Sequence, residues 1–174
     1  KSKALQLADT HLLKGEIGPI IFEKQVLTIN THLEDAFASG ATLLTGSRKC
    51  EQINGGYYCK PTVLVNVTQN MLVMQQETFG PIMPVMAYDQ LDEMIEMVNS
   101  SAYALGAAVF AGTEEEALAV AQRINAGSVS INEAALKAIL HYGDSVSFNW
   151  SGVGGLRIGP ENFSRFVKKK YFHF

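Results

Sequence analysis

The sequence predicts an α/β protein with a largely parallel sheet covered by helices. In its second half, apolar runs typical of strands alternate with amphipathic segments typical of helices. Helices between strands form crossover connections, which join parallel strands and cover the faces of the sheet. A chain of 174 residues with 47% hydrophobic content is long enough to bury one core. We therefore expect residues 1–174 to form a single domain.

The first half is expected to begin with an amphipathic helix. Apolar residues keep near-helical spacing across residues 23–39, and Gly40 follows as a C-terminal cap. Residues 41–45 predict a short strand, and residues 62–67 (TVLVNV) predict another because they are rich in β-branched side chains. Between these strands, residues 47–59 (SRKCEQINGGYYC) indicate a surface loop or a hairpin turn.

The second half has a more regular rhythm. Strands are predicted at residues 82–88, 106–111 and 127–132, and helices at residues 91–99 and 114–124. Both helices have one apolar and one charged face.

A capping box starts the second of these helices, where Thr113 precedes Glu116 by three residues. After residue 132 the periodicity weakens, and a last helix is predicted to open at Pro160. We expect residues 1–15 to be the remnant of a preceding helix with its linker, and residues 160–174 to be a C-terminal helix and tail.

Composition argues against two classes of partner. The net charge is −3, and the only basic run is Lys168–Lys170, which we expect to pair with the negative end of the last helix and with solvent. No stretch reaches transmembrane length. We therefore expect neither a nucleic-acid partner nor a membrane partner.

The cysteines and histidines show no metal-ligand pattern. Cys50 and Cys59 match neither a zinc knuckle nor a redox pair, so we expect two free thiols in a reducing, cytoplasmic compartment. The histidines are scattered, which indicates surface or internally satisfied roles and no metal site. They are His11, His32, His141 and His173.

A glycine-rich loop near the C-terminus invites a nucleotide interpretation. The spacing of the glycines in SGVGGLRIG (151–159) fits neither the dinucleotide motif nor the P-loop motif. We therefore expect a close-packed loop there and no phosphate site.

Residues 76–84 (QETFGPIMP) predict a sharp corner between a helix and a strand. Pro81 forbids ordinary helix continuation, and Gly80 tolerates backbone conformations that other residues resist. From the residues alone, Glu77 is either a solvated acid in a turn or a carboxylate aimed at a ligand.

The order of seven motifs resembles the C-terminal, catalytic-domain part of the aldehyde dehydrogenase superfamily over nearly the whole chain. The motifs are IGPII (17–21), GATLLTG (40–46), GGYYCKPTVLVNV (55–67), QETFGPIMPVMAYDQLDEMIEMVN (76–99), YALGAAVFA (103–111), INAGSVSIN (124–132) and SGVGG (151–155).

The resemblance implies a cofactor contact. In that family, the glutamate of the Glu-x-Phe-Gly-Pro element holds the hydroxyls of the nicotinamide ribose of NAD or NADP, a role that falls on Glu77 here. The ring of Phe79 would lie beside the nicotinamide. A carboxylate can accept hydrogen bonds from both hydroxyls of a diol, so the chemistry agrees with this assignment.

The resemblance also implies an activity that this chain cannot complete. The family oxidises aldehydes through a cysteine thioester, and its nucleophile, oxyanion-hole asparagine, general base and cofactor-binding sheet precede the matching segment. Neither Cys50 nor Cys59 occupies the nucleophile's position. We therefore expect this chain alone to be inactive, to bind the cofactor weakly or not at all, and to contain no catalytic residue.

Two further features follow from the resemblance. The segment SVSFNWSGVGG (145–155) departs from the family pattern, in a part of the chain that borders the aldehyde entrance in the family. We expect Phe148, Asn149 and Trp150 to line that entrance. The last segment resembles a branch whose C-terminus closes against a neighbouring subunit, which implies a homo-oligomer.

Three interpretations of function remain open on the sequence. The chain is a part of an NAD(P)-dependent aldehyde dehydrogenase, or a non-catalytic interaction or assembly module derived from that family. The third is an unrelated α/β module in which Glu77 binds another small ligand.

Overall fold

The computed structural model describes residues 5–8, 15–134, 147–152 and 170–173. Residue contacts divide the chain into two compact units, residues 1–87 and 88–174. Each unit has its own cluster of buried apolar side chains. The single domain expected over residues 1–174 stays a prediction.

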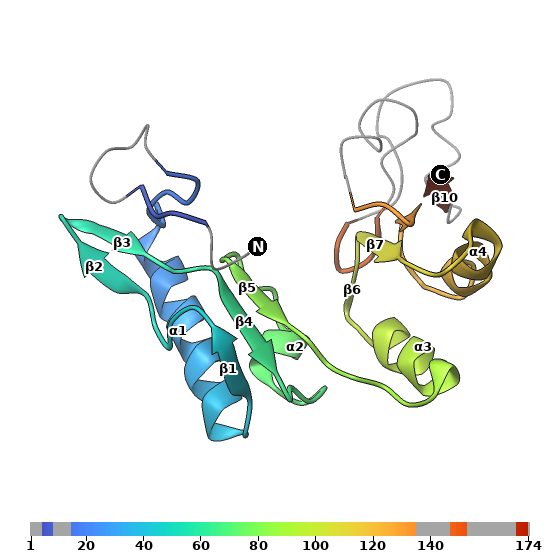
Figure 1. The fold of residues 1–174 in the computed structure, drawn as a ribbon, viewed down its shortest axis with the longest axis horizontal. Coiled ribbons are helices and arrows are strands. Elements are labelled where there is room, and N and C mark those ends of the chain that lie inside the picture. Colours follow the sequence, from blue (N-terminus) through green and yellow to red (C-terminus); the bar gives the residue numbers. More distant parts are fainter. Residues whose placement is uncertain (1–4, 9–14, 135–146, 153–169, 174) are drawn as a thin grey trace. The chain divides into compact units, whose positions relative to one another are not determined.

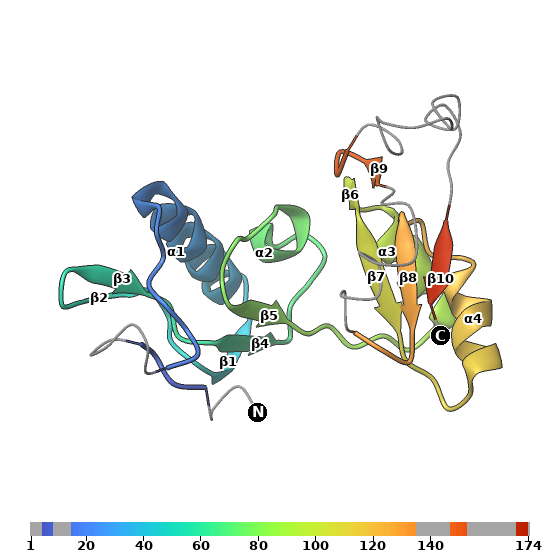
Figure 2. The same ribbon diagram turned by 90° about the horizontal axis from the view of Figure 1, so that it is seen from above.

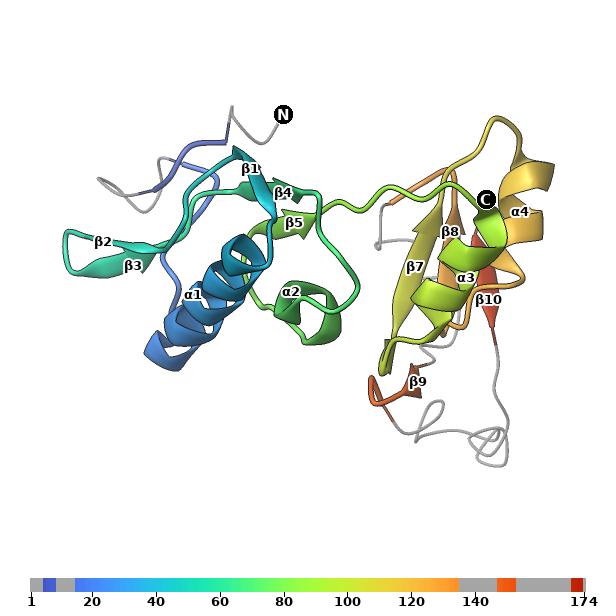
Figure 3. The same ribbon diagram turned by 90° about the horizontal axis from the view of Figure 1, so that it is seen from below.

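The first unit places helices over a three-stranded sheet. Its elements are α1 (Glu23–Ala38), β1 (Thr42–Thr45), β2 (Glu51–Ile53), β3 (Gly56–Tyr58), β4 (Thr62–Val65), α2 (Leu72–Gln75) and β5 (Ile82–Pro84). The sheet has the order β1–β4–β5, with β4 antiparallel to β1 and parallel to β5 (Figure 1). α2 lies in the crossover between the two parallel strands. Figures 2 and 3 show α1 and α2 on the same face of this sheet.

α1 supplies most of the helical side of the first core. Its buried apolar residues recur every three or four positions and therefore share one face. They are Val26, Ile29, Leu33 and Ala36. They form one cluster with Leu64 of β4, which is fully buried, so apolar surface from helix and sheet leaves water together. The predicted helix is confirmed, and Gly40 follows it with φ of +99°, as expected for a cap.

β2 and β3 form a hairpin, which is one of the two alternatives that the sequence left open. Its turn residues Asn54 and Gly55 have φ of +50° and +82°, and a type I′ turn requires positive φ at both positions. Asparagine and glycine tolerate this conformation better than other residues do, so the local sequence determines the turn.

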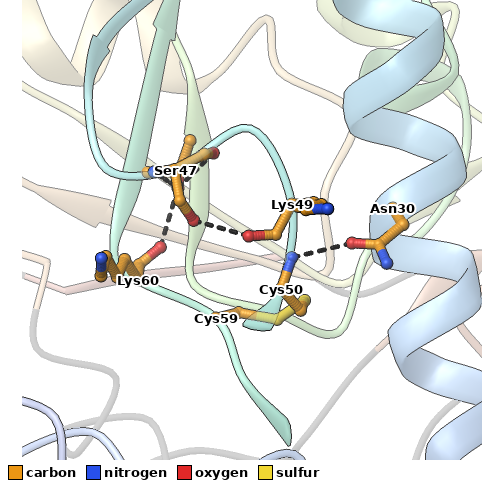
Figure 4. Close-up of a disulfide and its surroundings, with 7 residues drawn as sticks. Asn30, Ser47, Lys49, Cys50, Cys59 and Lys60 are labelled. Carbon is orange, nitrogen blue, oxygen red and sulfur yellow. Dashed lines mark hydrogen bonds between the residues drawn. A yellow bond between two sulfur atoms is a disulfide. The ribbon is translucent and has the colours of Figure 1, made fainter. Parts of the chain in front are cut away.

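The prediction of two free thiols is wrong, because Cys50 and Cys59 form a disulfide (Figure 4). The hairpin pairs Glu51 with Tyr58, so the two cysteines are the next opposed pair, with Cα atoms 4.3 Å apart. Their separation fits no zinc or redox motif, but the strand register brings the sulfurs together. The Cys50 amide donates a hydrogen bond to Asn30 Oδ1 on α1 at 2.9 Å, which fastens the base of the hairpin to that helix. The cytoplasmic location stays a prediction, now without support from free thiols.

The second unit is built around a parallel sheet. Its elements are α3 (Leu91–Asn99), β6 (Tyr103–Ala104), β7 (Gly106–Val109), α4 (Glu114–Ala121), β8 (Ser128–Ile131), β9 (Phe148–Asn149) and β10 (Tyr171–His173). The sheet has the order β10–β8–β7, and both pairings are parallel. β6 and β9 form a separate antiparallel pair. Side chains of α3 and α4 join β8 in one buried cluster, and Figure 3 shows α3 in front of the sheet.

α4 starts with the predicted capping box. The Glu116 amide donates to Thr113 Oγ1 at 3.2 Å, and the Thr113 amide donates to Glu116 Oε2 at 3.1 Å. Two amides at the helix start, which have no partner within the helix, are thereby satisfied. The helix ends at Ala121, three residues before the predicted end, and a turn leads to the next strand.

β10 is an element that the sequence did not reveal, and Lys170 lies directly before it. The Lys170 ammonium donates to the carbonyl oxygens of Ala121, at 3.1 Å, and of Ile124. These carbonyls lie at and just beyond the C-terminal end of α4, where positive charge is favourable. Partial burial lowers the pKa of Lys170 below its usual value. Lys170 therefore binds the C-terminal end of α4, whereas the sequence predicted that it pairs with the end of the last helix.

The predicted α/β fold class is confirmed. β4–β5, β7–β8 and β8–β10 are parallel pairs, and helices lie in the crossovers that join the first two. The predicted helix from Pro160, apart from its last residues, and most of the glycine-rich loop lie outside the described residues. None of the helices in the described ranges is long and apolar enough to cross a membrane.

We expect the disulfide to be detectable chemically. The unfolded but unreduced chain should resist alkylation by iodoacetamide, whereas reduction should expose two thiols, as counted by intact mass. Replacing both cysteines by serine should lower the free energy of unfolding by roughly 2–3 kcal/mol, because the unfolded chain loses a constraint. Two alkylated cysteines before reduction would contradict the pairing.

Candidate functional site

The predicted corner at QETFGP joins α2 to β5 through two tight turns. The Gly80 amide donates to the Thr78 carbonyl, and the Ile82 amide donates to the Gly80 carbonyl, both at 2.8 Å. The second turn is centred on Pro81, whose ring fixes φ near the value that an inverse γ-turn needs. The Pro81 carbonyl also accepts a 2.8 Å hydrogen bond from Thr62 at the start of β4, so the sheet anchors the corner.

Gly80 is required for close packing. It lies outside the left-handed φ region, but a Cβ at this position would be 2.7 Å from Ile29 Cδ1. Ile29 is fully buried on α1, so a shift of its side chain would disturb a close-packed core. The sequence prediction attributed the glycine to backbone conformation, whereas the structure shows that the absence of a side chain is what matters.

Two polar side chains of α1 also hold this segment. Asp35 Oδ2 accepts a hydrogen bond from the Leu72 amide at 2.7 Å, which places a carboxylate at the N-terminal end of α2. His32 Nδ1 lies 2.5 Å from Thr78 Oγ1. Sequence reasoning gave Asp35 no role and treated His32 as a surface or satisfied residue. In the sequence, the one sign that these two polar residues make internal contacts is their position on the apolar face of an amphipathic helix.

Glu77 and Phe79 point away from this support. Both side chains are exposed, and 69% of the Phe79 surface is accessible. Within the described part of the chain, the Glu77 carboxylate has neither a hydrogen-bond nor an ion-pair partner. The Glu77 carboxylate, which is an acceptor, and the apolar Phe79 ring therefore flank Thr78, which is bonded to α1. Such a pair can bind a hydroxyl-bearing ligand that also has a planar apolar part.

The residues predicted at the substrate entrance differ in exposure. Phe148 is buried against Ala104, whereas Trp150 is 83% exposed. Asn149 has φ of +53°, and its Nδ2 donates to the Ser101 carbonyl at 3.3 Å. These residues belong to the second unit, while Glu77 and Phe79 belong to the first. Their role at an aldehyde entrance stays a prediction.

A groove of about 580 Å³ lies in the second unit, between α3, β7 and α4. Its lining is mostly aliphatic and aromatic. The one carboxylate in its lining, Glu116, is engaged in the capping box. The groove therefore offers apolar surface without a candidate acid, base or nucleophile.

The described residues offer little else for catalysis. Both cysteines of the chain are in the disulfide, so neither supplies a thiolate. No group of three or more histidine, cysteine, aspartate or glutamate residues gathers as a metal site within the described ranges.

The sequence pattern of the aldehyde dehydrogenase family matches residues 1–172. The chain belongs to this family. A curated relative, the "Putative aldehyde dehydrogenase" of Staphylococcus haemolyticus, is 36% identical over 140 residues. That match covers 80% of this chain and 29% of the relative, so the chain spans less than a third of that relative's length.

Solved aldehyde dehydrogenase structures share the fold. The structure of "Putative Aldehyde Dehydrogenase PutA" from Anabaena variabilis has 50% identity and a TM-score of 0.86, over 95% of this chain and 35% of that chain. Lactaldehyde dehydrogenase from Escherichia coli has 29% identity and a TM-score of 0.79, over 95% and 34% of the two chains. A betaine aldehyde dehydrogenase from Staphylococcus aureus, solved in complex with NAD+, has 29% identity and a TM-score of 0.78, over 92% and 32%.

Alanine at position 80 should test the packing of the corner. Gly80→Ala places a methyl group against Ile29 and should lower the free energy of unfolding by about 1–3 kcal/mol, measured by urea denaturation. Gly18→Ala is the matched control, because a Cβ there meets nothing within 4 Å. Equal stability of the two variants would contradict the close contact.

Proposed function

We propose that this chain is the C-terminal catalytic-domain part of an NAD(P)-dependent aldehyde dehydrogenase. The complete enzyme oxidises an aldehyde to a carboxylic acid through a cysteine thioester, with hydride transfer to the nicotinamide. Membership of the family supports this proposal, as does the coverage of about a third of the solved relatives. The observation that carries the proposal is the exposed Glu77 carboxylate, which lies on a corner held in place by contacts with α1.

Glu77 and Phe79 are the residues that would hold the cofactor. The two oxygens of the Glu77 carboxylate would accept hydrogen bonds from the two hydroxyls of the nicotinamide ribose, and the Phe79 ring would lie beside the nicotinamide. The group fits these residues, because the carboxylate has no partner within the described residues and the ring is open to a ligand. The rigid corner fixes the direction of both side chains before binding, which reduces the entropy cost.

The chemical step needs groups from outside this chain. Cys50 and Cys59 are joined to each other and cannot attack an aldehyde. The chain's own contribution is to orient the cofactor and, through Trp150 and its neighbours, to border the aldehyde entrance. The substrate class is an aldehyde, and the complete enzyme is a homo-oligomer.

A non-catalytic interaction or assembly module is the second candidate function. It is favoured by large apolar side chains exposed on the first unit, among them Ile21, Phe22 and Leu44, which are 100%, 64% and 61% exposed. Such surface stabilises a protein only when a partner covers it. A strictly monomeric, highly soluble chain would count against this candidate.

Removing the charge of Glu77 should weaken cofactor binding. In the complete polypeptide that contains this chain, Glu77→Gln should raise the dissociation constant of NAD+ about tenfold or more, because the amide oxygen accepts a weaker bond and the amide nitrogen accepts none. Isothermal titration calorimetry measures the change. Glu34→Gln, which neutralises an exposed carboxylate on α1, is the control and should bind NAD+ like the wild type. If the two variants bind equally well, Glu77 is not the ribose ligand.

The isolated chain should not turn over an aldehyde. Purified residues 1–174 with NAD+ and a panel of short aldehydes should form no NADH above the rate of a protein-free control, because no thiolate is present. Absorbance of NADH provides the measurement. Aldehyde-dependent NADH formation by this chain, free of other subunits, would overturn the assignment of the chemistry to the rest of the enzyme.

A further inference from the structure

A buried histidine of α1 contacts the residue between Glu77 and Phe79. His32 is only 2% exposed, and its Nδ1 lies 2.5 Å from Thr78 Oγ1, across 46 positions of sequence. A buried imidazole without a partner would cost free energy, so this hydrogen bond is what makes the histidine tolerable in the core. The proposed cofactor site uses neither His32 nor Thr78 directly.

Three residues on one side of α1 contact the segment that carries the proposed site. Ile29, His32 and Asp35 are spaced by three residues, which places them on the same side of the helix. In that order, they meet Gly80, Thr78 and Leu72. The outer two contacts fix the end of the corner and the start of α2. The His32 contact fixes the point between them.

The contact at Thr78 determines the direction of the two neighbouring side chains, Glu77 and Phe79. Burial alternates along the segment, with Thr78 half-buried and both Glu77 and Phe79 exposed. The Thr78 side chain is therefore on the inner side of the segment, toward α1, and its two neighbours are on the outer side. Holding the Thr78 hydroxyl against α1 therefore keeps Glu77 and Phe79 on the outer side.

We propose that His32 is a positioning residue for the nicotinamide-ribose site and acts through Thr78. This inference rests on the proposed function, because it assumes that Glu77 and Phe79 contact the cofactor. Without the bond, the carboxylate remains but samples several directions, so binding the cofactor has to restrict it. The loss should therefore raise the KM for NAD+ and leave kcat nearly unchanged.

The decisive variants remove or keep the hydroxyl of Thr78 in the complete polypeptide that contains this chain. Thr78→Val has nearly the same shape without a donor or acceptor and should raise the KM for NAD+ about three- to tenfold, the scale of one hydrogen bond. Thr78→Ser keeps the hydroxyl and should stay within about twofold of the wild type. Because Thr78 is half-buried, Thr78→Ala is a second hydroxyl-free variant if valine prevents folding.

Changes at the histidine provide the reciprocal test. His32→Leu removes the ring nitrogen and should match Thr78→Val, whereas His32→Asn places an amide group near the position of Nδ1 and should restore part of the affinity. Combining His32→Leu with Thr78→Val should raise KM no further than either change alone, because both remove the same bond. Thr28→Val on α1 is the control, since its hydroxyl bonds the carbonyl of Lys24 in its own helix.

Amide hydrogen exchange in the 174-residue chain measures how firmly the backbone around Thr78 is held, and it does not require enzyme activity. Amides of residues 77–79 should exchange faster in Thr78→Val than in the wild type and Thr78→Ser. Equal exchange rates, or lower stability with an unchanged KM for NAD+, would overturn the proposal and leave His32 as a packing residue.

The Glu77→Gln variant separates the two levels of inference. If Glu77→Gln weakens NAD+ binding and Thr78→Val does not, the positioning role fails while the proposed function stands. If Glu77→Gln has no effect on NAD+ binding, the proposed function fails and the positioning role fails with it.

Discussion

The inner face of α1 is the constraint on which the first unit depends. Its apolar residues bury against β4, and the same face carries His32 and Asp35, whose hydrogen bonds reach the segment between α2 and β5. Hydrophobic burial fixes the helix, and a fixed helix allows its polar side chains to act as rigid anchors. The tight turn at Pro81 owes its shape to proline. The corner owes its position to this helix, against which Gly80 packs.

The corner shows how exposure and rigidity are combined. The proposed role of Glu77 and Phe79 requires exposed side chains, and both side chains are exposed. Exposed side chains alone have few contacts that restrict them. Here the backbone beneath them is restrained by Thr62, by Ile29 and by His32. A structural relative, the betaine aldehyde dehydrogenase of Staphylococcus aureus, was solved in complex with NAD+, and this supports the proposal that the corner contacts such a cofactor.

The second unit is joined by contacts between distant segments. β8 is paired on both sides by parallel strands, and Lys170 fastens the approach to β10 onto the C-terminal carbonyls of α4. The capping box satisfies the opposite end of the same helix. Charge and hydrogen bonding at the two helix ends therefore support a sheet in which β8 is entirely buried.

The sequence by itself determined the fold class, through the alternation of strand and helix patterns. It also determined local features: α1, the capping box at Thr113 and the corner at Pro81, with a hairpin turn at residues 54–55 as one of two alternatives. Each depends on residues within a few positions of one another, where spacing and backbone preference are sufficient. Only the tertiary structure decided the disulfide, the packing under Gly80, the pairing of β10 and the contact of His32 with Thr78. Periodicity shows which side chains turn inward, but what they meet there depends on strand register and on segments far away in the chain.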